Sequence, residues 1–125
     1  MAEITFTGNK KLKTINSEWC AKFPYLYLGF FNAEDKPVGD WTKNHTEARA
    51  KKDASELLTT ATMNVSTFES RYKAAFGTVV EIKYIKNGRK YRSINEHNSL
   101  TLSELNKWAE TNGCSKIREA HPEWF

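Results

Sequence analysis

Cysteine is scarce in this 125-residue sequence and long apolar runs are missing, and both features restrict the class of protein. No run approaches the roughly 18 apolar residues that span a membrane, and residues 1–5 lack the start of a secretory signal. We interpret the two cysteines, Cys20 and Cys114, as reduced thiols, with a single long-range disulfide of an exported domain as the alternative. We therefore expect a cytoplasmic protein without a membrane partner.

Motifs of catalysis and metal binding are also missing. His45, His97 and His121 are dispersed in or beside predicted loops, without a second His or Cys at zinc-ligand spacing, and we interpret them as exposed. The sequence has neither a Gly-x-Ser-x-Gly elbow nor a Gly-rich phosphate loop. Cys20 is expected to pack on a helix face, and the alternative for Cys114 is an exposed, reactive thiol. We expect no cofactor and no metal site.

The composition that is present indicates a folded domain. Hydrophobic residues make up 39% of the chain and aromatic residues 13%, which is too much apolar material for a disordered protein. A chain of this length buries one modest core, so we expect residues 1–125 to form a single domain.

Apolar side chains recur at helical spacing in three segments, residues 12–23, 65–76 and 102–111. Ser66 with Glu69, and Thr101 with Glu104, have the spacing of capping boxes at helix starts. Gly77 suits the left-handed position that ends a helix. These signals predict helices packed on a sheet.

An internal repeat is predicted, because residues 3–23 align without a gap to residues 56–76. Both segments read as a short strand, a polar connection and a helix with the same apolar register. A strand is expected after each helix, at residues 25–31 and 79–85. The predicted fold is α+β, with a mainly antiparallel sheet and a βα pseudo-repeat.

Two further segments carry weaker signals. Residues 45–55 are predicted to form a polar helix that follows a loop. Residues 121–125 are expected to be an extended tail.

The strongest local signal is a basic hairpin at residues 79–94. Asn87-Gly88 interrupts two alternating runs and favours a two-residue turn. The segment contains one acid, Glu81, and five cations, whose excess equals the +4 net charge of the whole chain. Alternation is expected to place Val80, Ile82, Tyr84 and Tyr91 on the core face, and Lys83, Ile85, Lys90, Arg92 and Ile94 on the other. Glu81 lies diagonal to Arg92 and is expected to offset part of the cross-strand repulsion between Lys83 and Arg92.

The order of segments resembles a family of small uncharacterised bacterial proteins. The matching features are a helix ending in Phe76-Gly77, a strand at residues 79–82, a turn at Gly88 and the sequence Thr101-Leu102-Ser103-Glu104-Leu105-Asn106. The resemblance covers residues 65–106. It implies a cytoplasmic bacterial domain and implies no activity.

We predict a non-enzymatic interaction domain that binds nucleic-acid phosphate through the five hairpin cations, which are Lys83, Lys86, Arg89, Lys90 and Arg92. Lys10, Lys11 and Lys13 would enlarge this patch if their loop lies nearby. Three alternatives stay open. The cations could only solubilise an edge strand. The chain could bind a protein through an exposed surface formed by Tyr27, Trp41, Trp124, Ile85 and Ile94. The aromatic residues of this set would otherwise lie in the core. It could also be a small enzyme without a recognisable motif.

Overall fold

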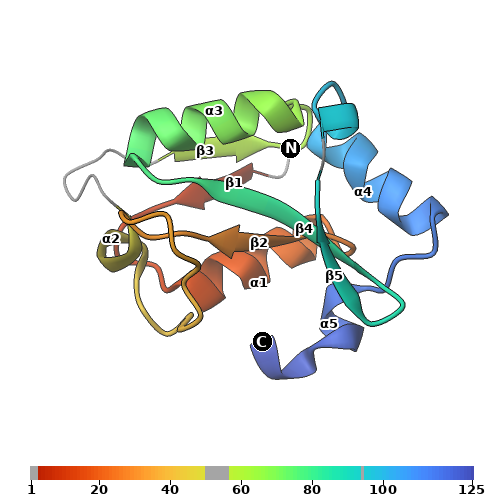
Figure 1. Ribbon diagram of the computed structural model, residues 1–125, viewed down its shortest axis with the longest axis horizontal. Helices are drawn as coiled ribbons and strands as arrows, with labels where there is room; N and C mark the ends of the chain where they lie inside the picture. The colour runs from red at the N-terminus through yellow and green to blue at the C-terminus, as the bar shows by residue number, and fades with distance from the viewer. Residues whose placement is uncertain (1–2, 50–56, 94) are drawn as a thin grey trace.

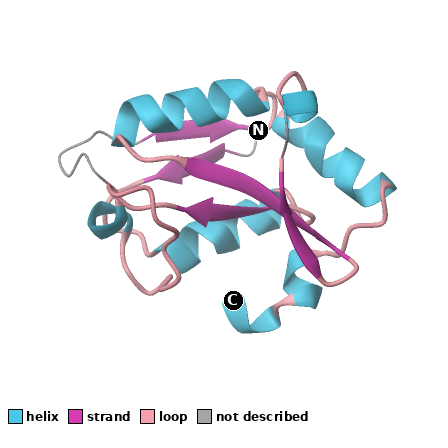
Figure 2. Cartoon of the chain, in the orientation of Figure 1, coloured by secondary structure: helices cyan, strands magenta, loops and turns pink. Residues whose placement is uncertain are grey.

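The computed structural model describes residues 3–49, 57–93 and 95–125. Within these ranges the chain has the predicted α+β fold, with antiparallel sheets of two and three strands (Figure 1). The helices are α1 (Leu12–Lys22), α2 (His45–Ala48), α3 (Val65–Phe76), α4 (Leu102–Thr111) and α5 (Ile117–Ala120), with short 3-10 helices η1 (Asn95–His97) and η2 (Pro122–Trp124). The strands are β1 (Glu3–Phe6), β2 (Tyr27–Phe30), β3 (Leu57–Thr60), β4 (Val80–Lys86) and β5 (Arg89–Arg92), as Figure 2 shows.

The strands form two antiparallel groups. β1 pairs with β3, and β4 lies between β2 and β5 in what we call the hairpin sheet. Side chains alternate between the two faces of a strand. On β2, Leu28 and Phe30 therefore point into the core, whereas Tyr27 and Gly29 belong to the opposite face, which we call the outer face.

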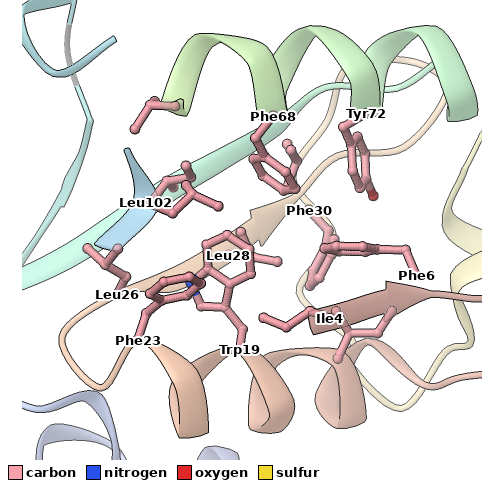
Figure 3. Close-up of a cluster of buried hydrophobic side chains, with 14 of the residues drawn as sticks. Ile4, Phe6, Trp19, Phe23, Leu26, Leu28, Phe30, Phe68, Tyr72 and Leu102 are labelled. Atoms are coloured by element: carbon pink, nitrogen blue, oxygen red, sulfur yellow. The ribbon is translucent and has the colours of Figure 1, made fainter. Parts of the chain in front are cut away.

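The main core lies between α1 and α3. Figure 3 shows Trp19 of α1 and Phe23, the residue that follows α1, on the side of the core opposite Phe68 and Tyr72 of α3, with side chains of the strands between them. The rings of Trp19 and Phe68 are 5.2 Å apart, and all four aromatic side chains are buried. Buried aromatic side chains contribute large apolar areas to folding. The apolar stripes that predicted the two helices thus pack directly against each other.

The predicted turns are present. Gly77 ends α3 with a φ of 75°. Asn87 and Gly88 have φ values of 54° and 76°, as a two-residue hairpin turn requires, and Tyr84 pairs with Tyr91 across β4 and β5. Local turn chemistry therefore determines both the end of α3 and the register of the hairpin.

The start of α3 differs from the prediction. The Ser66–Glu69 capping box is wrong, because Asn64 is the N-cap and, within the described residues, no side chain caps this helix. An isolated β-bridge to Thr101 holds Asn64 in extended backbone, so the helix begins before Ser66. The capping box of Thr101 and Glu104 is confirmed at the start of α4.

The predicted helix at residues 45–55 is only partly described. α2 spans His45–Ala48, and Arg49 returns to extended backbone with a ψ of 159°. Residues 50–56 lie outside the described part of the chain. Asn44 and Glu47 form a capping box at the start of α2 that the sequence analysis missed.

A buried side chain holds β2 to α1. The Asn16 side-chain amide donates to the Leu28 carbonyl at 3.0 Å, and its carbonyl accepts from the Leu28 amide at 2.8 Å. Asn16 is fully buried, so these bonds satisfy backbone groups that water does not reach. The side chain thereby completes the hydrogen bonding of Leu28.

Replacing Asn16 with leucine is expected to destabilise the fold by roughly 2–6 kcal/mol, because two buried backbone groups lose their partners at about 1–3 kcal/mol each. The matched control is Asn106→Leu, since Asn106 makes one bond to the Tyr25 amide at a half-buried position. Urea unfolding followed by circular dichroism measures both. Equal losses in the two variants would contradict the role of Asn16.

His45 is fully buried, so its predicted exposure is wrong. Its Nε2 lies 2.7 Å from the Tyr72 hydroxyl, and Arg49 lies 3.2 Å from its Nδ1. Because the guanidinium is only a donor, Nδ1 accepts and the neutral ring donates from Nε2. Burial, followed by the Arg49 charge, lowers the pKa of His45 to about 4.

Stability is expected to fall as the pH drops from about 6.5 to about 4. The unfolded chain binds a proton at His45 below about pH 6.5, whereas the folded chain resists it until about pH 4. The loss attributable to His45 is about 3 kcal/mol, and it is absent above pH 7 because both states are then neutral. Urea midpoints of the native protein and of His45→Gln across this range test it. Parallel pH profiles would contradict the assignment.

The two halves of the chain share a set of backbone hydrogen bonds. The Leu12 amide donates to the Lys43 carbonyl, and the Val65 amide donates to the Leu100 carbonyl, each at 2.9 Å. His45 donates to Lys10 at 2.8 Å, and Leu102 donates to Met63 at 2.9 Å. Backbone hydrogen bonds thus join the start of α1 to that of α2, and the start of α3 to that of α4. These bonds agree with the predicted repeat, which stays a prediction that superposition of the halves would test.

Candidate functional site

The hairpin cations divide between the two faces of the hairpin sheet. Lys83 lies opposite Arg92, and Lys90 lies opposite Ile85, so these three cations share the outer face as predicted. Lys86 and Arg89 flank the turn and alternate to the other face. The predicted set of five cations therefore does not form one cluster.

Glu81 compensates part of the outer-face charge. Its carboxylate lies 3.2 Å from Arg92 and 3.8 Å from Lys83, which confirms that it offsets the repulsion between these two cations. The Arg92 side chain is 71% exposed, whereas that of Lys83 is 29% exposed. Surface ion pairs of this kind contribute little to stability. Their main consequence here is a lower net charge beside the outer face.

The C-terminal segment, residues 114–125, covers one end of the outer face, and its predicted extended tail is wrong. α5 and η2 pack beside the hairpin, as Figure 1 shows at the blue end of the chain. The Ser115 amide donates to the Ile85 carbonyl at 2.8 Å, and the Ile117 amide donates to the Pro24 carbonyl at 2.9 Å. These bonds position the segment over the sheet.

This cover corrects the predicted exposure of two side chains. Tyr27 is 3% exposed and Ile85 is 1% exposed, and both pack in a second buried cluster with Cys20 and Ile117. The sequence pattern placed Ile85 on the outer face correctly, but it contained no signal that another segment covers that face. Ile94 lies outside the described residues.

Four rings gather at the covered end, which we call the aromatic cluster: Tyr27, Trp41, His121 and Trp124. Trp124 stacks on His121 with centroids 4.0 Å apart and packs edge-on against Trp41 at 4.9 Å. Its centroid is 5.0 Å from that of Tyr27. The Lys90 ammonium lies 5.3 Å from the Trp124 ring centre, a cation–π contact that joins the cluster to the hairpin.

A groove of about 470 Å³ runs beside this cluster. The lining comes from α1, β2, the loop after it, the hairpin and η2, and comprises Lys13, Tyr27, Gly29, Phe30, Phe31, Pro37, Val38, Gly39, Asp40, Trp41, Thr42, Lys83, Lys90, Glu123 and Trp124. The volume falls within the range of about 300–1,000 Å³ that small-molecule sites occupy. We take this groove as the candidate site.

Local contacts bring the lysines of the groove together. The Lys13 amide donates to the Trp41 carbonyl at 2.9 Å, which ties the first turn of α1 to the loop that carries Trp41. A Cβ at Gly29 would lie 2.9 Å from the Lys83 side chain, so glycine at this position lets Lys83 cross the face of β2. The predicted enlargement of the patch thus holds for Lys13. Lys10 instead pairs with Glu18 at 2.8 Å.

Two carboxylates share the lining with these lysines. Hydrogen bonds from Thr42 lower the pKa of Asp40, and a hydrogen bond from His121 at 2.7 Å lowers the pKa of Glu123. Both groups are therefore ionised at neutral pH. The groove presents cations and hydrogen-bond acceptors beside aromatic rings, rather than a uniformly basic surface.

The Tyr27 hydroxyl is buried at the base of the aromatic cluster. Burial, followed by the Glu81 charge, raises the pKa of Tyr27 to about 12. Among the described residues, this hydroxyl has no hydrogen-bond partner. It is a neutral hydroxyl that belongs to a ring packed against Trp41 and Trp124.

Two functional absences apply to the described part of the chain. Its His, Cys, Asp and Glu residues form no group of three that could hold a metal ion. No helix in the same residues is long and apolar enough to cross a bilayer.

His97, like His45, is buried rather than exposed as predicted, with its ring 4.4 Å from that of Trp108.

Comparisons with protein-family models, curated proteins and solved structures find no match to this chain. The resemblance to small bacterial proteins therefore stays a prediction.

Both cysteines are buried free thiols. Burial raises the pKa of Cys20 to about 12, and its Sγ donates to the Leu26 carbonyl at 3.2 Å. Burial also raises the pKa of Cys114 above the usual value of a thiol. Cys114 is not exposed, contrary to the alternative interpretation, since its relative exposure is 7%.

Both thiols are expected to react more slowly with a thiol reagent than free cysteine does at neutral pH. The thiolate is the reactive form, and burial disfavours it at both positions. Stopped-flow titration of the native protein measures the rates, and denatured protein supplies the unprotected reference. Fast modification in Cys20→Ala, which isolates Cys114, would return the enzyme alternative to consideration.

Proposed function

We propose that this domain binds nucleic-acid phosphate through the outer face of the hairpin sheet. The observation that supports the proposal is the position of Lys13 beside Lys83 and Lys90 in one groove lining, although Lys13 is distant in sequence. Arg92 extends the basic surface along β5 from the same face. Lysine and arginine side chains that neutralise phosphates supply the sequence-independent part of nucleic-acid affinity.

The distribution of charge favours partner binding over solubility alone. Cations that only protect an edge strand are expected on β2 or β5, the two edge strands of the hairpin sheet. Lys83 instead lies on the central strand, and Lys13 belongs to a helix. Protein recognition through the exposed surface predicted around Tyr27 and Ile85 is less well supported, because both side chains are buried within the fold.

Binding is expected to weaken steeply as the salt concentration rises, because each neutralised phosphate releases counterions. Replacing Lys83, Lys90 and Arg92 with glutamine should weaken binding and flatten the salt slope by about three phosphate contacts. Fluorescence anisotropy with labelled single-stranded and duplex DNA and RNA, measured over a range of salt concentrations, gives both quantities.

The matched control replaces Arg71, Lys73 and Lys107 with glutamine. These three substitutions remove the same charge as the outer-face substitutions. The residues are exposed and lie on α3 and α4 rather than in the groove lining. The control should weaken binding less than the outer-face variant. Equal effects would show that only net charge matters, and no binding to any nucleic acid at low salt would refute the proposal.

A further inference from the structure

We infer that the groove takes a single-stranded nucleic-acid segment, with one base stacked in the aromatic cluster and the adjoining phosphates on Lys13, Lys83 and Lys90. This inference rests on the proposed function and names the form of nucleic acid that fits it. Three features of the groove carry it: an accessible indole ring, neighbouring cations, and carboxylates that suit a base edge.

The indole ring comes from Trp41, which is half-buried and lines the groove. Its edge-on contact with Trp124 holds it in place, and the backbone bond from Lys13 fixes the loop that carries it. Aromatic side chains stack on bases of any sequence, since every base has a π-face. A rigid ring loses little conformational freedom when it receives a base.

The need for stacking distinguishes a single strand from a duplex. Bases within a duplex are already stacked on their neighbours, so a protein ring reaches them only after they unstack. Bases in a single strand are available to the ring without that cost. The half-buried Trp41 can therefore stack on single-stranded bases, whereas a duplex can offer mainly its phosphates to the lysines.

The groove has cations that suit the phosphates of a nucleotide and carboxylates that suit its base. Lys13, Lys83 and Lys90 supply cations for phosphate oxygens. Asp40 and Glu123 are ionised acceptors in the same lining, and acidic side chains accept hydrogen bonds from base amino groups. Thr42 and His121 already donate to these carboxylates, and the remaining acceptor capacity can be filled by base amino groups but not by a polyphosphate without bases. The mixed charge therefore favours a nucleotide over a plain polyanion.

The first test uses the unmodified protein. A labelled single strand of about ten nucleotides is compared with an abasic strand of equal length and with the corresponding duplex. The intact single strand should bind most tightly and quench tryptophan fluorescence, and the abasic strand should retain only the salt-sensitive part. Equal binding of intact and abasic strands, or tighter binding of the duplex, would overturn this inference and leave the proposed function standing.

The second test replaces Trp41 with leucine. Affinity for the intact strand should fall between about 5-fold and 150-fold, which is the contribution of one base–aromatic stack, while the salt slope stays unchanged because no phosphate contact is lost. Trp108→Phe is the control, since Trp108 packs against Tyr84 and His97 rather than in the groove, and it should bind normally. Unchanged affinity in folded Trp41→Leu would overturn the inference.

Competition with a free nucleoside monophosphate separates the two sources of this chemistry. The free nucleotide should compete far more weakly than the strand at equal nucleotide concentration, because it engages one phosphate. Equal competition would assign the groove to a free nucleotide and overturn the single-strand inference. If no nucleic acid or nucleotide binds at low salt, both the inference and the proposed function are wrong.

Discussion

The two hydrogen bonds between Asn16 and Leu28 fix the strand on which both the core and the groove depend. β2 is short, yet its residues serve two environments in alternation. Leu28 and Phe30 pack in the main core, whereas Tyr27 and Gly29 belong to the outer face. A slip of one residue would exchange these two sets. Because Asn16 satisfies both backbone groups of Leu28, α1 determines the register as well as the position of the strand.

The C-terminal segment supplies part of the groove lining through Glu123 and Trp124. Without α5 and η2, Tyr27 and Ile85 would form an exposed apolar patch beside the basic hairpin, and such patches promote association. The segment buries them and supplies Trp124, whose ring contacts Lys90 and Trp41. The same packing therefore stabilises the fold and assembles the proposed site. This dual role explains how cationic, aromatic and acidic side chains from distant parts of the chain come to share one lining.

Local signals predicted the elements, and nonlocal packing determined most of the site. Thr101 with Glu104, and Asn87 with Gly88, act through neighbours in sequence, so their helix start and turn were predictable. The capping box predicted at Ser66 was wrong because Asn64 forms an isolated β-bridge with Thr101, which is distant in sequence, and α3 begins directly after Asn64. His45 carried no sequence signal for burial, since Tyr72 and Arg49 enclose it only in the fold. Of the groove, the lysines and Trp41 were recognised as candidates, but their convergence depends on contacts with no local pattern.

The groove lies where the segments that follow α1 and α3 differ. After α3, the chain forms β4 and β5, which are joined by a tight turn and carry the cations. After α1, β2 leads instead into the loop that carries Asp40 and Trp41, and the chain returns to the start of α1 through the Lys13–Trp41 bond. Corresponding backbone hydrogen bonds nevertheless join helix starts in both halves. The groove therefore lies between the loop that follows β2 and the hairpin that follows α3, and η2 adds Trp124 to its lining.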